Sequence, residues 1–213
     1  MMNENKQAVV TFASRNGNYI NGMARLAESL RDRFHGAFLS FTDEASIGSP
    51  THAENNYAFK IYALQNAIDA GYTKLLWLDC SVFAVNHIQP IFDLIDKDGY
   101  FIQDSGWTCD QWTNKKTLKY FNTDGKGMTM FSSGVTGINI DSPIGKEFFN
   151  KWKQSMLDGM FNGSWKDFRH DQSNGSIIAN QMGLKIHSCN DYYSYKCEHV
   201  PPTDKTIFLL EGM

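Results

Sequence analysis

One stretch constrains the fold more than any other: residues 75–85, which read LLWLDCSVFAV. Two apolar runs flank a single carboxylate, Asp79, and two small residues. A run this apolar is typical of a strand buried on both faces, as strands in parallel sheets are. Asp79 falls where that strand should end, and open α/β sheets bind ligands at the carboxyl ends of their strands. Asp79 is therefore either an acid in a binding site or a residue that only turns the chain.

Strand-like and helix-like segments alternate ahead of this stretch. Residues 8–13 and 37–41 have the β-branched and aromatic content of strands, and residues 19–33 between them have helical spacing. Residues 57–70 also have helical spacing, and Gly71 fits the C-cap of that helix. The succession of strands and helices predicts an α/β fold with a central, mostly parallel sheet flanked by helices.

The second half of the chain is less regular. Residues 107–127 are polar and aromatic without periodicity, and we interpret them as a surface loop region. The other expected elements are helices at 89–95, 147–157 and 169–181 and strands at 100–103, 131–140, 184–187 and 206–210. The sequence contains no internal repeat, low-complexity tract or linker. We therefore expect one domain over residues 1–213, either as a whole protein or as one domain of a longer one.

Composition excludes several classes of function. The net charge is -3 with no block of like charge, so nucleic acid is not an expected partner. No apolar run reaches the roughly 18 residues of a membrane span, and residues 1–7 lack a signal peptide's apolar core, so we expect a cytoplasmic protein. No Cys-x-x-Cys pair occurs, which argues against structural zinc and suits free thiols in a reducing compartment. The four cysteines are Cys80, Cys109, Cys189 and Cys197.

Four further segments form an ordered set. They are residues 8–33, Tyr57-Ala58-Phe59-Lys60 ahead of the strand that ends in Asp79, FSSGVTGIN at 131–139, and RHDQS at 169–173. Together they resemble nucleotide-sugar glycosyltransferases of the GT-A fold. The third is similar to the F-N-x-G-V-x-x-I-N strand of retaining galactosyltransferase-like members, and the fourth to their D-Q helix start, which faces the sugar. Small enzymes of this kind occur in bacterial polysaccharide pathways and in large DNA viruses.

The resemblance implies a single GT-A, Rossmann-like domain and a hexosyltransferase type of glycosyltransferase. Such an enzyme would move a sugar from a nucleotide-sugar donor, here expected to be a UDP-sugar, to a glycan or glycoprotein acceptor, with retention. It implies catalytic roles for Asp171 and Gln172. It assigns donor binding to Thr11, Ala13, Arg15, Lys60, Asp79, Cys80, Ser81 and Lys205. Trp107, Asp110 and Trp112, in the irregular loop, are candidates for acceptor binding, although such a tryptophan can equally pin a loop to the core.

The resemblance also implies a divalent metal ion in the site. Breaking the glycosidic bond leaves negative charge on the diphosphate, and Mn²⁺ or Mg²⁺ would stabilise that charge. Asp79 offers a hard oxygen ligand, whereas Ser81, at the second acid of the family's D-x-D motif, offers only a hydroxyl. His199 is the third expected ligand, because His199 and Lys205 keep the spacing of the family's H-x-x-G-x-x-K motif. Pro202 replaces the glycine of that motif.

Other interpretations stay open from the sequence alone. Lys60 would fit a solvated helix face, Asp171 a helix cap, and His199 an ordinary surface position. A nucleotidylyltransferase is a second candidate function, but it would have a glycine-rich, basic loop where residues 14–18 have one Gly and one Arg. A non-catalytic nucleotide- or sugar-binding module is a third, and the missing acid at Ser81 favours it.

Overall fold

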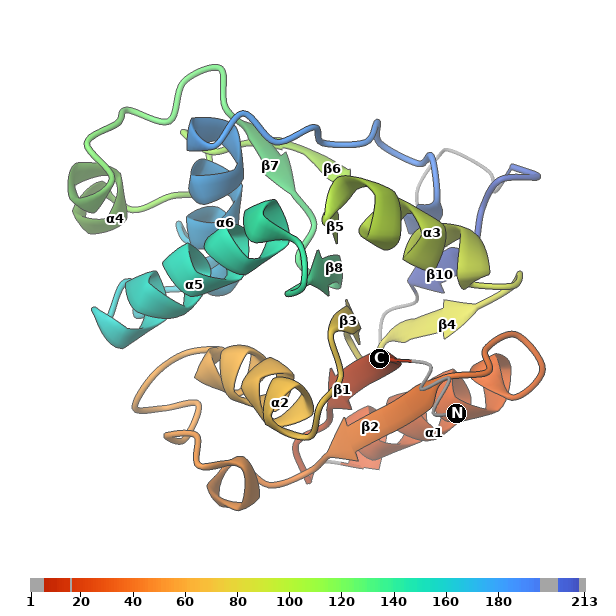
Figure 1. The fold of residues 1–213 in the computed structure, drawn as a ribbon. Coiled ribbons are helices and arrows are strands. Elements are labelled where there is room, and N and C mark those ends of the chain that lie inside the picture. The colour runs from red at the N-terminus through yellow and green to blue at the C-terminus, as the bar shows by residue number, and fades with distance from the viewer. Residues whose placement is uncertain (1–5, 16, 196–202, 211–213) are drawn as a thin grey trace.

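A computed structural model describes residues 6–15, 17–195 and 203–210 of the chain (Figure 1). Within them, the central sheet has five strands in the order β2-β1-β3-β8-β5. Strands β1, β2 and β3 pair in parallel, and β8 runs antiparallel to both β3 and β5. Helices cover this mostly parallel sheet, so the predicted α/β fold class is confirmed.

The first half of the chain follows the predicted alternation closely. Its elements are β1 (Gln7–Phe12), α1 (Gly17–Leu30), β2 (Ala37–Phe41), the 3-10 helix η1 (Ala45–Ile47), α2 (Ala58–Asp69), β3 (Lys74–Leu78) and β4 (Val82–Ala84). Local apolar patterns predict these elements, because the strands are buried in the sheet and the helices α1 and α2 pack an apolar face on it.

The second half adds smaller sheets and two long helices. Its elements are α3 (Gln89–Asp98), β5 (Tyr100–Phe101), β6 (Asp104–Thr108), α4 (Lys115–Tyr120), β7 (Thr129–Phe131), β8 (Val135–Asn139), α5 (Pro143–Leu157), α6 (His170–Gln181), β9 (Tyr193–Tyr195) and β10 (Phe208–Leu210). Strands β4, β10 and β9 form a three-stranded sheet, and β6 pairs with β7.

Strand β3, the middle strand of the five-stranded sheet, belongs to the most apolar stretch of the sequence because it is buried on both faces. Leu75 and Trp77 belong to the core on the side of α2, α5 and α6. Leu76 and Leu78 belong to the core on the opposite side, with residues of α1, α3 and β10. Successive side chains of a strand point to opposite faces, so burial on both faces requires an unbroken apolar run. Figure 1 shows α2 and α5 on one side of β3, and α3 with β10 on the other.

Three sequence predictions need correction. The predicted loop 107–127 contains helix α4, whose N-cap Asn114 accepts a hydrogen bond from the Thr117 amide at 2.8 Å. The strand predicted at 131–140, with an irregularity marked by glycine, is two strands, because the chain turns at residues 132–134 between β7 and β8. The strand predicted at 184–187 is reduced to one isolated bridge between Gln103 and His187.

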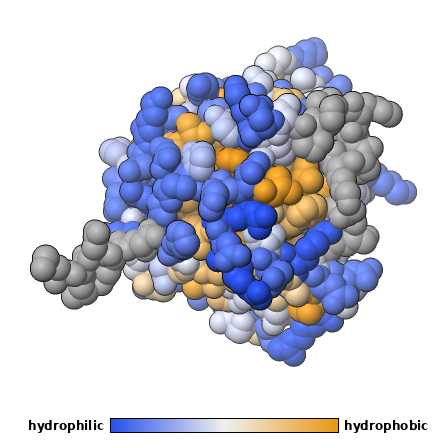
Figure 2. Space-filling view, turned by 90° about the vertical axis from the view of Figure 1, so that its right-hand side faces the viewer, coloured by the Kyte–Doolittle hydropathy of each residue, from blue (hydrophilic) through white to orange (hydrophobic). Residues whose placement is uncertain are grey.

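The described surface is mixed in polarity, and two of the cysteines are buried. No helix among the described residues is long and apolar enough to cross a membrane. Figure 2, which faces the side of α3 and β4, shows hydrophilic residues over most of the surface and a smaller group of apolar residues near its middle. Such mixed surfaces are ordinary for globular domains. Cys80 and Cys109 are buried free thiols, and Cys197 lies outside the described residues.

Candidate active site

Asp79 lies immediately after β3, at the carboxyl end of the sheet. Its backbone amide donates to the Gly134 carbonyl at 2.9 Å, and its own carbonyl accepts from the Val82 amide at 2.9 Å, so the residue does turn the chain. Its side chain is nevertheless 42% exposed and faces a cavity. A Cβ on Gly134 would lie 3.1 Å from the Asp79 carboxylate, so glycine permits this close approach.

A buried lysine joins this carboxylate to a second one. The Lys60 ammonium lies 2.6 Å from Asp171 Oδ2 and 3.7 Å from Asp79 Oδ1, and it donates to the Ser133 carbonyl at 2.9 Å. Lys60 is 1% exposed and Asp171 is 3% exposed. The interpretation of Lys60 as a solvated residue is therefore wrong. Asp171 forms an ion pair with Lys60, and the Trp152 indole fixes the backbone of Asp171 by donating to the Asp171 carbonyl.

The two side-chain contacts of Asp79 with other described residues use the same carboxylate oxygen. The Trp77 indole donates to Oδ1 at 2.6 Å, and Lys60 also faces Oδ1. Lys60 lies 5.2 Å from the centre of the Trp77 ring, within the range of a cation–π interaction. The side chain is thus oriented through Oδ1, and Oδ2 remains for a ligand.

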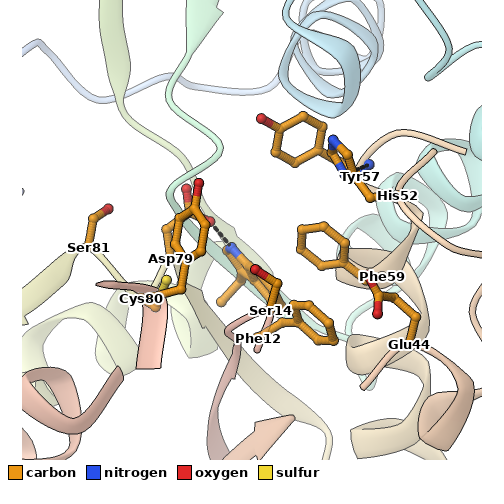
Figure 3. Close-up of a pocket in the computed structure, with 11 residues that line it drawn as sticks. Phe12, Ser14, Glu44, His52, Tyr57, Phe59, Asp79, Cys80 and Ser81 are labelled. Atoms are coloured by element: carbon orange, nitrogen blue, oxygen red, sulfur yellow. Dashed lines mark hydrogen bonds between the residues drawn. The ribbon is translucent and has the colours of Figure 1, made fainter. Parts of the chain in front are cut away.

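Two cavities meet at Asp79. The first, of about 400 Å³, is mostly aromatic, and Figure 3 shows His52, Tyr57 and Phe59 along one side of it and Asp79 with Cys80 along another. Its lining residues are Phe12, Ser14, Tyr19, Glu44, His52, Tyr57, Phe59, Trp77, Asp79, Cys80 and Ser81.

The second cavity, of about 230 Å³, is more polar. Its lining residues are Tyr57, Lys60, Asp79, Ser81, Ser132, Ser133, Gly134, Trp165, Arg169, Asp171, Gln172 and Leu210. Tyr57, Asp79 and Ser81 line both cavities. A ligand with an aromatic end, a charged middle and a polar end would fill the pair.

Tyr57 stands where the two cavities join, in an uncommon backbone conformation. Its φ of 58° is left-handed, a conformation that costs energy for a tyrosine and that clusters at functional sites. Its ring lies 4.8 Å from that of His52 and 5.1 Å from that of His170. Burial, together with Asp171 and Asp79, raises the pKa of Tyr57, so its hydroxyl stays protonated at neutral pH.

Burial also favours the neutral form of two histidines and a cysteine near the site. It lowers the pKa of His52 and of His170 below the ordinary 6.5, against the smaller opposing effect of Asp171. It raises the pKa of Cys80 to about 12, so this thiol is a poor nucleophile at pH 7. The ionisable side chains that line the second cavity include Lys60, Asp79, Asp171 and Arg169, and burial lowers the pKa of Arg169 from its ordinary value.

The structure brings together most of the residues implied by the D-x-D and D-Q motifs. Lys60, Asp79, Ser81, Asp171 and Gln172 all line the second cavity, and Cys80 lines the first. The Ser133 amide donates to the Gln172 amide oxygen at 3.5 Å, which fixes the start of α6 beside β8.

Other predicted residues lie elsewhere and line neither cavity. Thr11 and Ala13 are buried in and after β1, and Arg15 is exposed and pairs with Asp43 at 3.0 Å. The loop between β1 and α1 does reach the first cavity, but through Ser14 and not through Arg15. Lys205 is exposed in the turn before β10.

The three acceptor candidates also line neither cavity: Trp107 is 49% exposed on β6, Asp110 is exposed, and Trp112 is half-buried. His199 lies outside the described residues. The roles assigned to all of these residues stay predictions.

The structure adds site residues that sequence reasoning did not assign. Glu44 and His52 come from the polar segment 42–56, which crosses to the first cavity. Trp165, from an exposed loop, lines the second cavity and stacks on the His170 ring at 5.6 Å and 15°. No sequence pattern marks these positions. The sequence did mark Arg169, because it belongs with His170 to a run of polar residues at the start of α6.

Comparisons with known proteins give a fold relationship. No family model matches the chain, and no curated protein matches it in sequence. A solved structure does match: the apo form of mouse xyloside xylosyltransferase 1, with a TM-score of 0.58, 14% identity and 96% of each chain covered. The chain therefore has the fold of a glycosyltransferase over nearly its whole length. The expected likeness to bacterial and viral members stays a prediction.

Proposed function

We propose that the chain is a glycosyltransferase that uses a nucleotide-sugar donor. The observation that carries this proposal is the position of Asp79 between an aromatic cavity and a polar one. A nucleoside would stack in the first cavity, the diphosphate would pass Asp79 and Ser81, and the sugar would enter the second. Largely preformed cavities with a few convergent polar groups are the usual form of such sites. We infer a UDP-hexose as donor and a glycan or glycoprotein as acceptor.

In the proposed reaction, different residues of the second cavity have different roles. The bond between the anomeric carbon and the diphosphate oxygen breaks, a bond to the acceptor oxygen forms, and the departing diphosphate oxygen takes the proton of the acceptor hydroxyl. Lys60 places a fixed positive charge beside the departing diphosphate, where charge develops. Asp171, locked by Lys60 at 2.6 Å, orients a sugar hydroxyl, and Gln172 lies near the reacting carbon. Buried, preoriented groups of this kind need no reorganisation during the reaction.

The described residues suit a divalent cation of the magnesium or manganese type. Asp79 and Ser81 supply hard oxygen donors on the rim that both cavities share. No group of three His, Cys, Asp or Glu side chains that could hold a metal occurs in the described part of the chain. Such cations commonly bind through one or two protein oxygens plus substrate phosphates and water. We propose that Asp79 and Ser81 hold the ion only together with the donor, where it would neutralise diphosphate charge.

Replacing Ser81 by aspartate is expected to tighten manganese binding by at least about tenfold, because a second carboxylate raises the charge of the ligand set. Isothermal titration of Mn²⁺ in the presence of UDP measures this affinity directly. The Ser81→Ala variant is the control and should bind the ion no more tightly than the unmodified protein. Unchanged affinity in Ser81→Asp would mean that this side chain faces away from the ion.

We expect the product to retain the anomeric configuration of the donor. An inverting enzyme needs a base that deprotonates the acceptor hydroxyl. The carboxylates that line the second cavity are Asp79, which we assign to the diphosphate, and Asp171, which is neutralised by Lys60. NMR of the linkage made from a donor of known anomer checks this expectation. An inverted product would contradict it and would make Asp171 the general base.

A thermal-shift screen over UDP-, GDP-, CMP- and dTDP-sugars with Mn²⁺ tests donor binding. A ligand at 100 times its dissociation constant adds about 2.7 kcal/mol to the free energy of unfolding. The proposal expects UDP-sugars to give the largest shift, and no shift with any nucleotide would overturn it. The second candidate is a non-catalytic binding module, favoured by the single acid at the D-x-D position. It would give the same shift, and donor turnover separates the two.

A further inference from the structure

Arg169 is held between two tryptophans at the edge of the second cavity. Its guanidinium carbon lies 3.6 Å from the centre of the Trp112 ring and 4.3 Å from that of the Trp165 ring. Its Nη1 donates to the Trp165 carbonyl at 2.6 Å. The planar group is therefore held by two aromatic rings and by one hydrogen bond. Its remaining N–H groups lie in the plane of the guanidinium.

The positive charge of Arg169 has no counter-charge in the described part of the chain. No Asp or Glu there lies within ion-pair distance of it, whereas Lys60 in the same cavity has two carboxylates. Arg169 also stands at the N-cap of α6, where the helix dipole disfavours a cation and favours an anion. The site thus holds an oriented guanidinium without a counter-charge from the residues that the structure describes, and a bound anion would stabilise it.

The chemistry of the surroundings defines the anion. A fixed guanidinium binds carboxylate in a two-pronged arrangement, which a lysine cannot reproduce. Trp165 is 56% exposed and offers a flat apolar face next to this charge. Arg169 lines the second cavity and not the first, so it lies on the sugar side of Asp79. We propose that Arg169, with Trp165, selects an acidic sugar by binding its carboxylate.

This inference rests on the proposed function, because it assigns the second cavity to sugars. A uronic acid could enter either as the transferred sugar of the donor or as part of the acceptor, and both present the same carboxylate. If Arg169 bound the donor diphosphate instead, removing it would weaken binding of UDP itself. If it served only to fasten the loops of Trp112 and Trp165, removing it would not change the preference between acidic and neutral sugars.

The test compares matched ligand pairs. Isothermal titration measures UDP-glucuronic acid against UDP-glucose, and saturation-transfer NMR measures methyl glucuronoside against methyl glucoside with and without UDP. The proteins are the unmodified chain, Arg169→Met, Arg169→Lys and the control Lys166→Met. Lys166 is exposed, lies three residues from Arg169 and lines neither cavity, so the control removes a nearby positive charge outside the site. Thermal unfolding of each variant reports whether it is folded.

The unmodified protein is expected to prefer the acidic member of at least one pair by about tenfold or more, the range of a hydrogen bond to a charged group. Arg169→Met should abolish this preference, Arg169→Lys should lose most of it, Lys166→Met should keep it, and all should bind UDP alike. Equal binding of both members by the unmodified protein, or a preference that survives in Arg169→Met, would overturn the inference. Failure of UDP to bind would instead count against the proposed function, since the methyl glycosides are compared without nucleotide as well.

Discussion

Replacing Lys60 by methionine is expected to lower the free energy of unfolding by about 3–5 kcal/mol, because it leaves a buried carboxylate without its partner. Asp171 is 3% exposed, and Lys60 lies 2.6 Å from its Oδ2. The substitution keeps most of the side-chain volume, so the loss reports the charge and not a cavity. Chemical denaturation of both proteins measures the difference.

The same variant should lose glycosyl transfer, because Lys60 fixes Asp171 and faces Asp79 at 3.7 Å. The double variant Lys60→Met, Asp171→Leu separates the two effects. Replacing both members of a buried ion pair by apolar residues is often neutral for stability, so we expect stability to return while transfer does not. Transfer that survives in Lys60→Met would show that the pair is only structural.

Replacing Asp79 by asparagine is expected to reduce turnover at least about 100-fold, the effect of removing one group that stabilises transition-state charge. The fold should persist, because the amide oxygen still accepts from the Trp77 indole and the lost contact with Lys60 involves a side chain 42% exposed. Steady-state release of UDP measures turnover, and circular dichroism checks the fold.

Asp96→Asn is the matched control for this substitution. Asp96 pairs with Lys74 at 2.7 Å on the surface and lines neither cavity. It loses the same charge without touching the site, so its turnover should equal that of the unmodified protein. Normal turnover in Asp79→Asn would remove Asp79 from the mechanism.

Much of the sheet is predictable because burial is encoded locally. The strand at residues 74–78 contributes side chains to the core on each face of the sheet. This burial on both faces can be read from the sequence as an unbroken apolar run. The position of Asp79 follows from the end of that run. Helix α4 was missed because it has six residues, KKTLKY, without an apolar stripe, although its Asn114 cap is a start signal.

The candidate site was predictable only in part, for a physical reason. Motif order indicated that Lys60 and Asp171 belong to one site, but they are 111 residues apart and nothing in either segment encodes their contact. The sequence alone left a solvated lysine open beside a functional one. Burial of both groups on the same cavity is a tertiary property, and it decides between those interpretations. The same holds for Arg169, whose two tryptophan neighbours come from separate loops.

The most direct test of the central claim, that this chain transfers sugar from a nucleotide, is UDP release from a panel of UDP-sugars. The reaction is run with Mn²⁺, with and without an added glycan acceptor. The account predicts release by the unmodified protein from at least one donor, faster with a suitable acceptor, and at least about 100-fold slower in Asp79→Asn. A protein that binds UDP in the thermal-shift screen but releases none from any donor would contradict catalysis and identify a binding module with a glycosyltransferase fold.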